Sequence, residues 1–318
     1  MTRAVLVRAP CRLHFGMFRF GHANAPQFGG VGVMVEPPAV EVTISQAPNF
    51  VVRGPHAERV EQFADAAARA WNLQRLPDCE LAVRAPDDHV GLGVGTQLGL
   101  SIAAGLRQFL NLSALPAETL AVAVGRAARS AVGTHGFQHG GLIVDAGHQP
   151  GQSIGTLQQR VAVPDGWRFV LVRPAQQRGL DGADESDAFG RLPPVPDHVT
   201  HELWQITHDD MLPALAQSDC RRFGEAVYRF GRLAGECFAA VQGGPFASPE
   251  IARLVESIRN HGIPGIGQSS WGPTVFALCE TEAEAQQLAA WLQKDARIPA
   301  NEITIASPNN HGAVIQER

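Results

Sequence analysis

The sequence has 318 residues, of which 45% are apolar and 18% charged, with a formal charge of −5 and a pI near 6.2. This length allows two domains of ordinary size, and the apolar content excludes a globally disordered chain. The near-balanced charge predicts neither a nucleic-acid-binding surface nor a polybasic membrane surface, so we expect small molecules as partners. The 26 basic residues include a single lysine, Lys294, so lysine-amine chemistry has one candidate.

The cysteines and the apolar runs predict a cytoplasmic protein. The five cysteines are an odd number and contain no CxxC pair, which argues against a disulfide framework and a thiolate zinc site. Met1–Leu13 alternates arginine with apolar residues and lacks the core of a signal peptide. The long uncharged runs Val90–Leu106 and Gly262–Cys279 are interrupted by Gly, Gln, Ser or Pro, so neither predicts a membrane span. The oligomeric state stays open, with a homodimer as one option.

In chain order, the first half predicts strands and helices that interleave. Apolar periodicity indicates strands at Ala4–Arg8, Leu13–Phe15, Val40–Ser45, Glu80–Arg84 and Gly140–Asp145. It indicates helices at Glu58–Trp71, Thr96–Phe109 and Ala117–Ala128. Residues 16–32 are expected to form a loop.

The second half opens with a polar, proline-rich and acidic segment, 173–196, which predicts an irregular connection or a lid. Strands are expected at Arg168–Val172, Thr274–Leu278, Ile303–Ala306 and Ala313–Ile315, and helices at Asp219–Gln242, Pro249–His261 and Glu282–Lys294. We therefore predict a two-domain α+β protein, with an N-terminal domain at 1–165 and a C-terminal domain at 166–318.

The glycine-rich segment Pro86–Gln97 runs from a predicted strand into a predicted helix. Gly91, Gly93 and Gly95 remove side chains where the backbone turns, and the helix that follows presents free N–H groups and a positive dipole end. This arrangement suits a phosphate, although the same pattern also occurs as a purely structural turn. It is not a Walker A loop, because no Gly-Lys-Ser or Gly-Lys-Thr follows.

Further motifs give this loop a context. Pro86–Gln97 resembles the phosphate-binding loop of the GHMP kinase superfamily, and Ala9–Gly16 and Gly265–Thr274 resemble its first and its late glycine-rich motifs. The residues within these motifs are most similar to those of one branch of the superfamily, the β-ribofuranosylaminobenzene 5′-phosphate synthases. The segments that carry this resemblance are Arg12–Gly16, Gly91–Gln97, Gly133–Gly141 and Gln268–Thr274.

The resemblance spans residues 9–279 and implies a fold, a site and a reaction. The fold would be GHMP-kinase-like, with an N-terminal α/β domain, a ferredoxin-like C-terminal domain and the site in the cleft. The implied reaction condenses phosphoribosyl pyrophosphate with 4-aminobenzoate or a related aromatic acid and releases pyrophosphate and CO₂. Its product serves tetrahydromethanopterin biosynthesis.

The residue types favour this synthase chemistry over phosphoryl transfer. A kinase usually needs Mg²⁺, a basic residue and often a carboxylate base. Here Gly95 stands where the kinase loop has its second serine, and the motifs contain no lysine. The region where such kinases often carry an aspartate reads His139-Gly-Gly, with Asp145 beyond it in an apolar strand. Departure of pyrophosphate needs N–H donors and cations, which the loop, Mg²⁺ and arginines would supply. Once the ring carbon has attacked C1, the cationic ring itself accepts the electrons left when CO₂ departs, so no redox cofactor is expected.

The candidate site residues come from these motifs. Catalytic roles are assigned to Arg12, His14, His139, Gln268 and Ser269. Phosphate binding is assigned to Gly91, Leu92, Gly93, Val94, Gly95, Thr96 and Gln97, and substrate contacts to Arg126, Arg129, Thr134, His135, Ser270 and Trp271. Either Arg12, or Gln268 with its neighbouring serines, would hold the aromatic carboxylate. Trp271 would stack on the aromatic ring or pack in the core.

His135 and His139 have the i,i+4 spacing of zinc ligands on a helix. Four glycines within 133–141 argue against a helix there. We therefore expect a turn that makes polar contacts to the substrate, and no metal held by protein side chains alone.

The chain also departs from the synthase pattern. The synthases carry an aspartate shortly after the first motif and an arginine before the next Gly-Gly pair, where this chain reads Met17–Phe20 and Pro26–Gly30. Two alternatives to the synthase therefore stay open: an ATP-dependent small-molecule kinase of the same fold, and a catalytically silent protein that binds a phosphate ligand.

Overall fold

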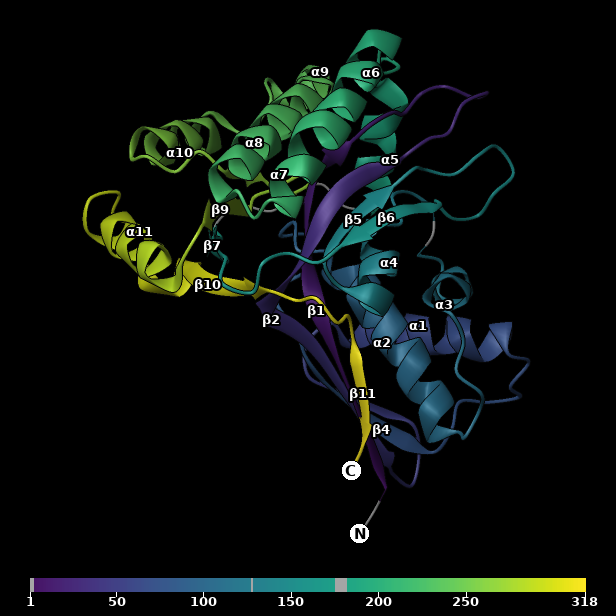
Figure 1. Cartoon of the computed structure of the whole chain (residues 1–318). Helices are drawn as coiled ribbons and strands as arrows, with labels where there is room; N and C mark the ends of the chain where they lie inside the picture. Colours follow the sequence, from purple (N-terminus) through teal and green to yellow (C-terminus); the bar gives the residue numbers. More distant parts are fainter. Residues whose placement is uncertain (1–2, 127, 175–181) are drawn as a thin grey trace.

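The computed structural model describes residues 3–126, 128–174 and 182–318, in which 11 strands form one sheet (Figure 1). The strands are β1 (Ala4–Met17), β2 (Gly30–Gln46), β3 (Val51–Arg53), β4 (Cys79–Arg84), β5 (Leu142–Asp145), β6 (Leu157–Val161), β7 (Arg168–Val172), β8 (Ile266–Gln268), β9 (Val275–Cys279), β10 (Ile303–Pro308) and β11 (Val314–Glu317). Their order is β11-β1-β2-β10-β7-β9-β8, with β4 and β5 also pairing with β2.

The helices divide between the two halves of this sheet. The first half holds α1 (Ala57–Ala70), α2 (Val94–Phe109), α3 (Ala117–Ala123) and α4 (Val132–His139). The second holds α5 (Gly182–Arg191), α6 (Asp197–Gln205), the π-helical turn η1 (Ile206–Met211), α7 (Leu212–Ala216), α8 (Cys220–Glu236), α9 (Ala239–Gln242), α10 (Pro249–Asn260), α11 (Glu282–Lys294) and the 3₁₀ turn η2 (Ala300–Glu302). None of the helices in the described ranges is long and apolar enough to cross a membrane.

The long antiparallel pair of β1 and β2 is the centre of the first half. Its register runs from Ala4 opposite Ser45 to Met17 opposite Gly30, with irregularities after Pro10 and after His14. The two short strands expected between residues 4 and 15 are therefore one bulged strand, and β2 begins inside the expected loop. Alternate β1 residues are buried under α2, which packs on both strands.

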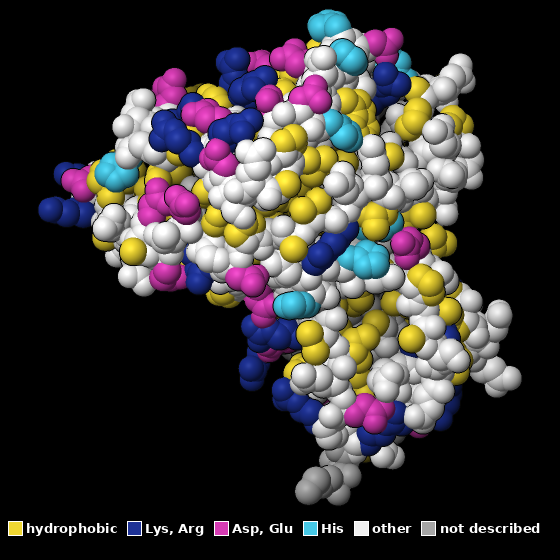
Figure 2. Space-filling view, in the orientation of Figure 1, with side chains coloured by type: hydrophobic (Ala, Val, Ile, Leu, Met, Phe, Trp, Pro, Cys, Tyr) yellow, Lys and Arg dark blue, Asp and Glu magenta, His cyan; other side chains and the backbone are white. Residues whose placement is uncertain are grey.

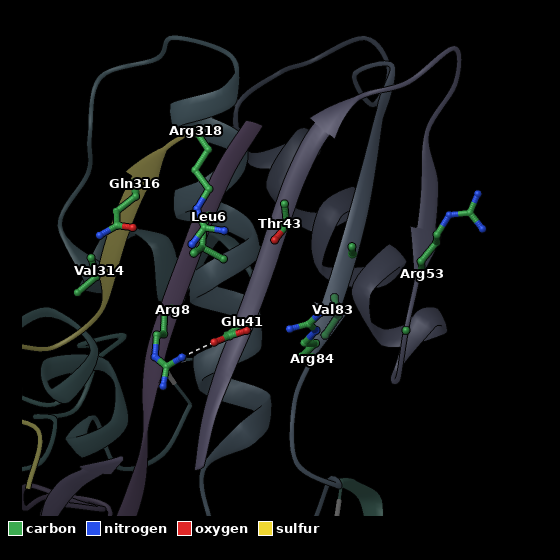
Figure 3. A pocket seen from close by; sticks show the side chains of 12 residues that line it. Leu6, Arg8, Glu41, Thr43, Arg53, Val83, Arg84, Val314, Gln316 and Arg318 are labelled. Carbon is green, nitrogen blue, oxygen red and sulfur yellow. Dashed lines mark hydrogen bonds and ion pairs between the residues drawn. The ribbon is translucent and has the colours of Figure 1, made fainter. Parts of the chain in front are cut away.

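The opposite face of this part of the sheet is an open groove (Figure 3). Side chains from β11, β1, β2, β4 and β3 line it, among them the ion pair between Arg8 and Glu41. The helices of this half therefore cover the α2 side of the sheet, and the glycine-rich loop leads directly into α2.

The second half buries β7 and β9 on both faces. Phe169, Leu171 and Phe276 face one apolar cluster together with α8, whereas Val170 and Val275 face a second cluster formed with α10 and α11. This period-2 alternation produces a layer of helices on each side of the strands. The space-filling view shows acidic and basic side chains interspersed over the helices of this half (Figure 2).

The structure confirms the α+β class and corrects several element predictions. Residues 132–139 form the helix α4, although four glycines within 133–141 argued against a helix. Gly136 is required there by packing, because it lies directly against Met34 and has no room for a side chain. Part of the segment expected to be irregular forms α5, while residues 175–181 lie outside the described ranges. The helix expected to reach Ala128 ends at Ala123, ahead of Gly125 with a φ of +66°.

The long helix expected up to Gln242 is interrupted between α8 and α9. The last strand, β11, returns to pair with β1, so the end of the chain completes the sheet of the first half. The division of the chain near residue 165 stays a prediction.

The buried hydroxyl of Ser269 joins three segments that are far apart in sequence. It accepts the backbone N–H of His14 at 2.9 Å and donates to the carbonyl of Gly91 at 2.6 Å. The N–H of Ser270 donates to the carbonyl of His14 at 3.1 Å, and the N–H of Thr274 donates to that of Val90 at 3.3 Å. These bonds set the turn between β8 and β9 against both β1 and the glycine-rich loop.

Replacing Ser269 by alanine should destabilise the protein by about 1–3 kcal/mol, because it removes the hydroxyl partner of one buried N–H and one buried carbonyl. Urea denaturation of the variant and the parent protein measures this difference. Ser113→Ala, at an exposed serine, is the matched control and should stay within about 0.5 kcal/mol of the parent. An S269A variant as stable as this control would show that the hydroxyl does not hold the three segments together.

Candidate functional site

A cleft of about 780 Å³ opens where β1, the start of α1, the glycine-rich loop, residues 125–126 and 128–130, and the β8–β9 turn meet. It collects many of the residues expected from the sequence. Those that line it are Arg12, His14, Gly91, Leu92, Gly93, Val94, Gly95, Thr96, Arg126, Arg129, Ser270 and Trp271. The remaining predicted residues, Gln97, Thr134, His135, His139, Gln268 and Ser269, are not among the lining residues.

The glycine-rich loop closes one side of the cleft. Gly91 and Gly93 have φ values of +84° and +68°, a conformation that glycine adopts without strain, and α2 starts at Val94, two residues earlier than expected. A Cβ on Gly93 would lie 3.3 Å from the Cβ of Arg12, so the loop backbone rests on that arginine. The first N–H groups of α2 therefore open toward the cleft beside a guanidinium.

Four arginines and two carboxylates give the cleft its charge. Arg12, Arg59, Arg126 and Arg129 line it together with Glu58 and Asp88. Arg59 and Asp88 were not expected from the sequence, because Arg59 reads there as one charge on the polar side of an amphipathic helix. The excess of guanidinium groups next to a helix N-terminus makes this cleft suited to a multiply charged anion.

His14 lies at the base of the cleft and is 2% exposed. Burial, and after it the positive charge of Arg12, lower the pKa of His14 well below its ordinary value. Its Nε2 lies 3.3 Å from the hydroxyl of Ser130, which donates to Asp145 Oδ2 at 3.2 Å. The Ser130 hydroxyl has one proton, and because it donates that proton to Asp145 it accepts a hydrogen bond from His14. The neutral imidazole of His14 therefore carries its proton on Nε2, and its Nδ1 is an acceptor.

Asp145 is buried behind His14 and is not a lining residue. It accepts the N–H groups of Ala131 at 2.6 Å and Gly147 at 2.9 Å. Desolvation nevertheless raises its pKa to about 6, and these two hydrogen bonds offset only part of that effect. Asp145 therefore orients Ser130 and the start of α4 and does not act on a ligand directly.

The side chains of Gln268 and Ser269, in the late motif, are hydrogen-bonded to backbone groups and do not line the cleft. The amide of Gln268 donates to the carbonyl of Ser270 at 2.9 Å and accepts the N–H of Ala247 at 2.7 Å. The hydroxyl of Ser269 bonds to backbone groups of β1 and of the loop. Both side chains shape the turn that presents Ser270 and Trp271, and the catalytic roles expected for them stay predictions.

The motif at 133–141 does not form the expected turn around the substrate. Thr134 and His135 are buried within α4, and His135 Nε2 lies 2.9 Å from the carbonyl of Gly155. Gln97 donates to the carbonyl of Gly133 at 2.8 Å and so joins the start of α2 to that of α4. His139 is half-buried at the far end of the helix. These residues pack in the layer behind the cleft. The helical backbone of α4 directs the side chains of Thr134 and His135 into this layer, so they do not line the cleft.

The region where the synthase pattern has its aspartate and arginine is occupied by aromatic residues. Phe20 and Phe28 lie in one apolar cluster with Phe189, Phe238 and Trp271. Trp271 meets Phe238 edge-on at 4.8 Å between ring centroids and lines the cleft, so the stacking and packing roles expected for it are compatible. The guanidinium of Arg129 lies 5.0 Å from the centre of the Phe189 ring, which connects this aromatic wall to the arginines.

Within the described ranges, no group of three or more His, Cys, Asp or Glu side chains is arranged to hold a metal ion. One oxygen in the cleft still suits a hard cation. Asp88 Oδ2 lies 2.9 Å from both His56 Nδ1 and Arg59 Nη1, while its Oδ1 is buried and has no hydrogen-bond partner among the described residues. A carboxylate oxygen of this kind fits Mg²⁺ when phosphate oxygens and water complete the coordination.

Comparisons with known proteins agree with this fold and these motifs. A family model described as the C-terminal part of GHMP kinases matches residues 211–297. The β-ribofuranosylphenol 5′-phosphate synthase of Archaeoglobus fulgidus is 31% identical over 292 residues, which cover 87% of this chain and 88% of the relative. The enzyme of the same name from Methanothermobacter thermautotrophicus is 29% identical over 303 residues, with 88% and 90% covered.

The solved structure of homoserine kinase from Cytophaga hutchinsonii superposes on 98% of this chain and 97% of its own with a TM-score of 0.71 and 15% identity. This likeness, together with the match to the family model, confirms the GHMP-kinase-like fold.

Replacing Gly93 by valine should remove binding of phosphoribosyl pyrophosphate, the ligand that the resemblance implies. The branched side chain would be forced against Arg12 from a left-handed backbone, which costs about 1–2 kcal/mol by itself. Gly151→Val is the matched control, since Gly151 has a φ of +86° and open space around its Cβ position. Calorimetric titration should show binding lost only in G93V; equal affinity in both variants would place the ligand elsewhere.

Asp145→Asn should change how stability depends on pH. Because burial raises the pKa of Asp145 from 3.8 to about 6, the folded protein binds this proton more tightly than the unfolded chain does. The resulting stabilisation is present below pH 4 and is lost as the pH rises through 6, by about 3 kcal/mol.

Urea denaturation of parent and D145N between pH 4 and 7 isolates this contribution, because the other groups titrate in both proteins. We expect the stability of the parent to fall relative to D145N as the pH rises. A difference that stays constant over this range would contradict the raised pKa.

Proposed function

The chain belongs to the family of β-ribofuranosylphenol 5′-phosphate synthases, and we propose that it transfers the phosphoribosyl group of phosphoribosyl pyrophosphate to an aromatic acid. Pyrophosphate and CO₂ leave, and the C-ribosyl product serves tetrahydromethanopterin biosynthesis. The observation that carries this proposal is a single cleft lined by four arginines and by Trp271, with Arg129 lying against the aromatic cluster that contains Trp271. Such a cleft accommodates a diphosphate and an aromatic ring side by side.

The loop side of the cleft is suited to the departing pyrophosphate. As the bond between C1 and the pyrophosphate oxygen breaks, negative charge grows on the leaving group and positive charge on the ribose. The first N–H groups of α2 and the Arg12 guanidinium, which lies against Gly93, stabilise the negative charge. Arg126 and Arg129 line the same cleft from the segment before α4, where they can hold the 5-phosphate.

Mg²⁺ is the cation that we expect to accompany phosphoribosyl pyrophosphate. Asp88 would hold it through its buried Oδ1. When bound, the ion neutralises diphosphate charge and so assists departure of the leaving group. Glu58 is the other carboxylate that lines the cleft in the described part of the chain.

The aromatic side of the cleft is suited to the acceptor. The ring carbon that bears the carboxylate forms the new bond to C1, and the electrons of its bond to CO₂ then restore the aromatic ring. An electron-donating group opposite the carboxylate favours this attack. The sequence motifs imply an amino group there, whereas the relatives' name specifies a phenol product and hence a hydroxyl group. The same ring chemistry serves both acceptors.

The neutral state of His14 fits this chemistry. A neutral ring adds no further positive charge beside Arg12, and its Nδ1 is an acceptor for a substrate O–H or N–H group. Ser130 and Asp145 hold the ring in this state from behind. His14 is therefore the residue that we assign to the acceptor, and Arg12 is assigned to the diphosphate.

The kinase alternative has weaker support. Asp88, which lines the cleft, is engaged by His56 and Arg59, and Asp145, which does not line it, lies behind Ser130. Neither is placed as the base of a phosphoryl-transfer site. A homodimer and a cytoplasmic location stay predictions.

The decisive experiment is a turnover assay with Mg²⁺, phosphoribosyl pyrophosphate and carboxyl-labelled 4-aminobenzoate or 4-hydroxybenzoate. We expect labelled CO₂ and pyrophosphate in equal amounts with at least one of the two acids. An Arg12→Gln variant should lose turnover and bind phosphoribosyl pyrophosphate more weakly by about tenfold or more. Binding without release of either product from both acids would favour the silent phosphate-binding protein, and ATP-dependent phosphorylation of a small molecule would favour the kinase.

A further inference from the structure

The guanidinium of Arg59 occupies space that a side chain at residue 95 would need. A Cβ built on Gly95 would overlap Arg59 Nη2 and would lie 2.8 Å from its Cζ. Arg59 is in the first turn of α1 and Gly95 in the first turn of α2. The absence of a side chain at residue 95 is therefore what allows a cation to sit on the N-terminal turn of α2.

This position is electrostatically unfavourable without an anion. The N-terminus of a helix carries about half a positive charge, so a guanidinium placed on it is repelled. One carboxylate oxygen, Asp88 Oδ2, offsets part of this repulsion from 2.9 Å, and His56 Nδ1 draws on the same oxygen at an equal distance. The two positive groups, the helix end and the guanidinium, face the same cleft.

The guanidinium is also held in place from several sides. Asp88 pairs with Nη1, and the ring of Phe63 lies 5.6 Å from Cζ. His56, whose Nε2 lies 2.9 Å from the carbonyl of Pro86, anchors Asp88 to the start of the loop. The side chain of Arg59 is 23% exposed, so it is neither a freely solvated charge nor a sealed ion pair.

We infer that Arg59 is a diphosphate-positioning residue and that Gly95 is the residue that admits it. The two form a composite anion site in which Nη2 and the first N–H groups of α2 hold the same pyrophosphate group, with Asp88 and His56 fixing the guanidinium. The inference rests on the proposed function for the identity of the substrate, but the site itself requires only that the cleft binds a diphosphate. It also explains why this loop has a glycine where the kinase loop has a serine.

Calorimetric titration with inorganic pyrophosphate tests the site directly. Arg59→Ala should weaken pyrophosphate binding by about 10- to 100-fold, the range expected for a lost charge-assisted hydrogen bond, and Arg59→Lys should restore part of it. Arg69→Ala, at the exposed arginine in the last turn of the same helix, is the matched control and should bind as the parent does. In turnover, Arg59→Ala should raise KM for phosphoribosyl pyrophosphate and leave KM for the aromatic acid unchanged.

Gly95→Ala tests the shared space. The added methyl group displaces the guanidinium, so this variant should lose pyrophosphate affinity to a similar extent as Arg59→Ala. In the double variant the two losses should not add, because the methyl group has no guanidinium left to displace. Additive losses, or a parent-like affinity in Arg59→Ala, would overturn the inference.

The outcomes separate this inference from the proposed function. A parent protein that binds pyrophosphate through Arg59 but turns over neither aromatic acid refutes the synthase and leaves the composite site standing. A parent protein that turns over substrate while Arg59→Ala keeps its pyrophosphate affinity and its KM refutes the composite site alone. A parent protein that binds no pyrophosphate refutes it as well.

Discussion

The site depends on one buried hydroxyl, that of Ser269, which bonds at once to β1 and to the glycine-rich loop. Glycine-rich loops are intrinsically free to adopt many conformations, and Gly91 has a backbone conformation that most residues avoid. A hydrogen bond to its carbonyl, made from a turn between two buried strands, selects one of these conformations. The first N–H groups of α2 and the side chain of Arg12 are thereby placed on the same cleft.

Behind this cleft, burial separates positive from neutral groups. Burial, and after it the positive charge of Arg12, lower the pKa of His14, so its imidazole is neutral beside that guanidinium. The hydrogen-bonded series from His14 through Ser130 to Asp145 then fixes which ring nitrogen carries the remaining proton. The cleft thus combines cations with an uncharged acceptor atom, the combination that the proposed decarboxylative ribosyl transfer requires.

Sequence reasoning identified the loop and misjudged the segment at 133–141. The four glycines there lower helix propensity, but Gly136 is required by contact with Met34, and Gly140 ends the helix with a φ of +61°. Tertiary packing therefore outweighs propensity and turns Thr134 and His135 into buried residues behind the cleft. The segment between α3 and α4 contributes through Arg126, Arg129 and Ser130 instead. Arg59 was not predicted because the residue it packs against, Gly95, is 36 positions away in the sequence. The contact depends on the absence of a side chain at Gly95, which no sequence pattern around Arg59 indicates.

The sequence by itself determined the α+β class, the family motifs and the position of the glycine-rich loop, because these follow from local periodicity and from glycines whose spacing is readable along the chain. It also indicated Arg12, His14 and Trp271, which the structure brings to one cleft. Only the tertiary structure decided that Gln268 and Ser269 shape a turn, that Asp145 lies behind Ser130, and that Arg59 sits on the end of α2. Each of these depends on contacts between residues distant in sequence, and burial and charge at such contacts arise only when the strands and helices have packed.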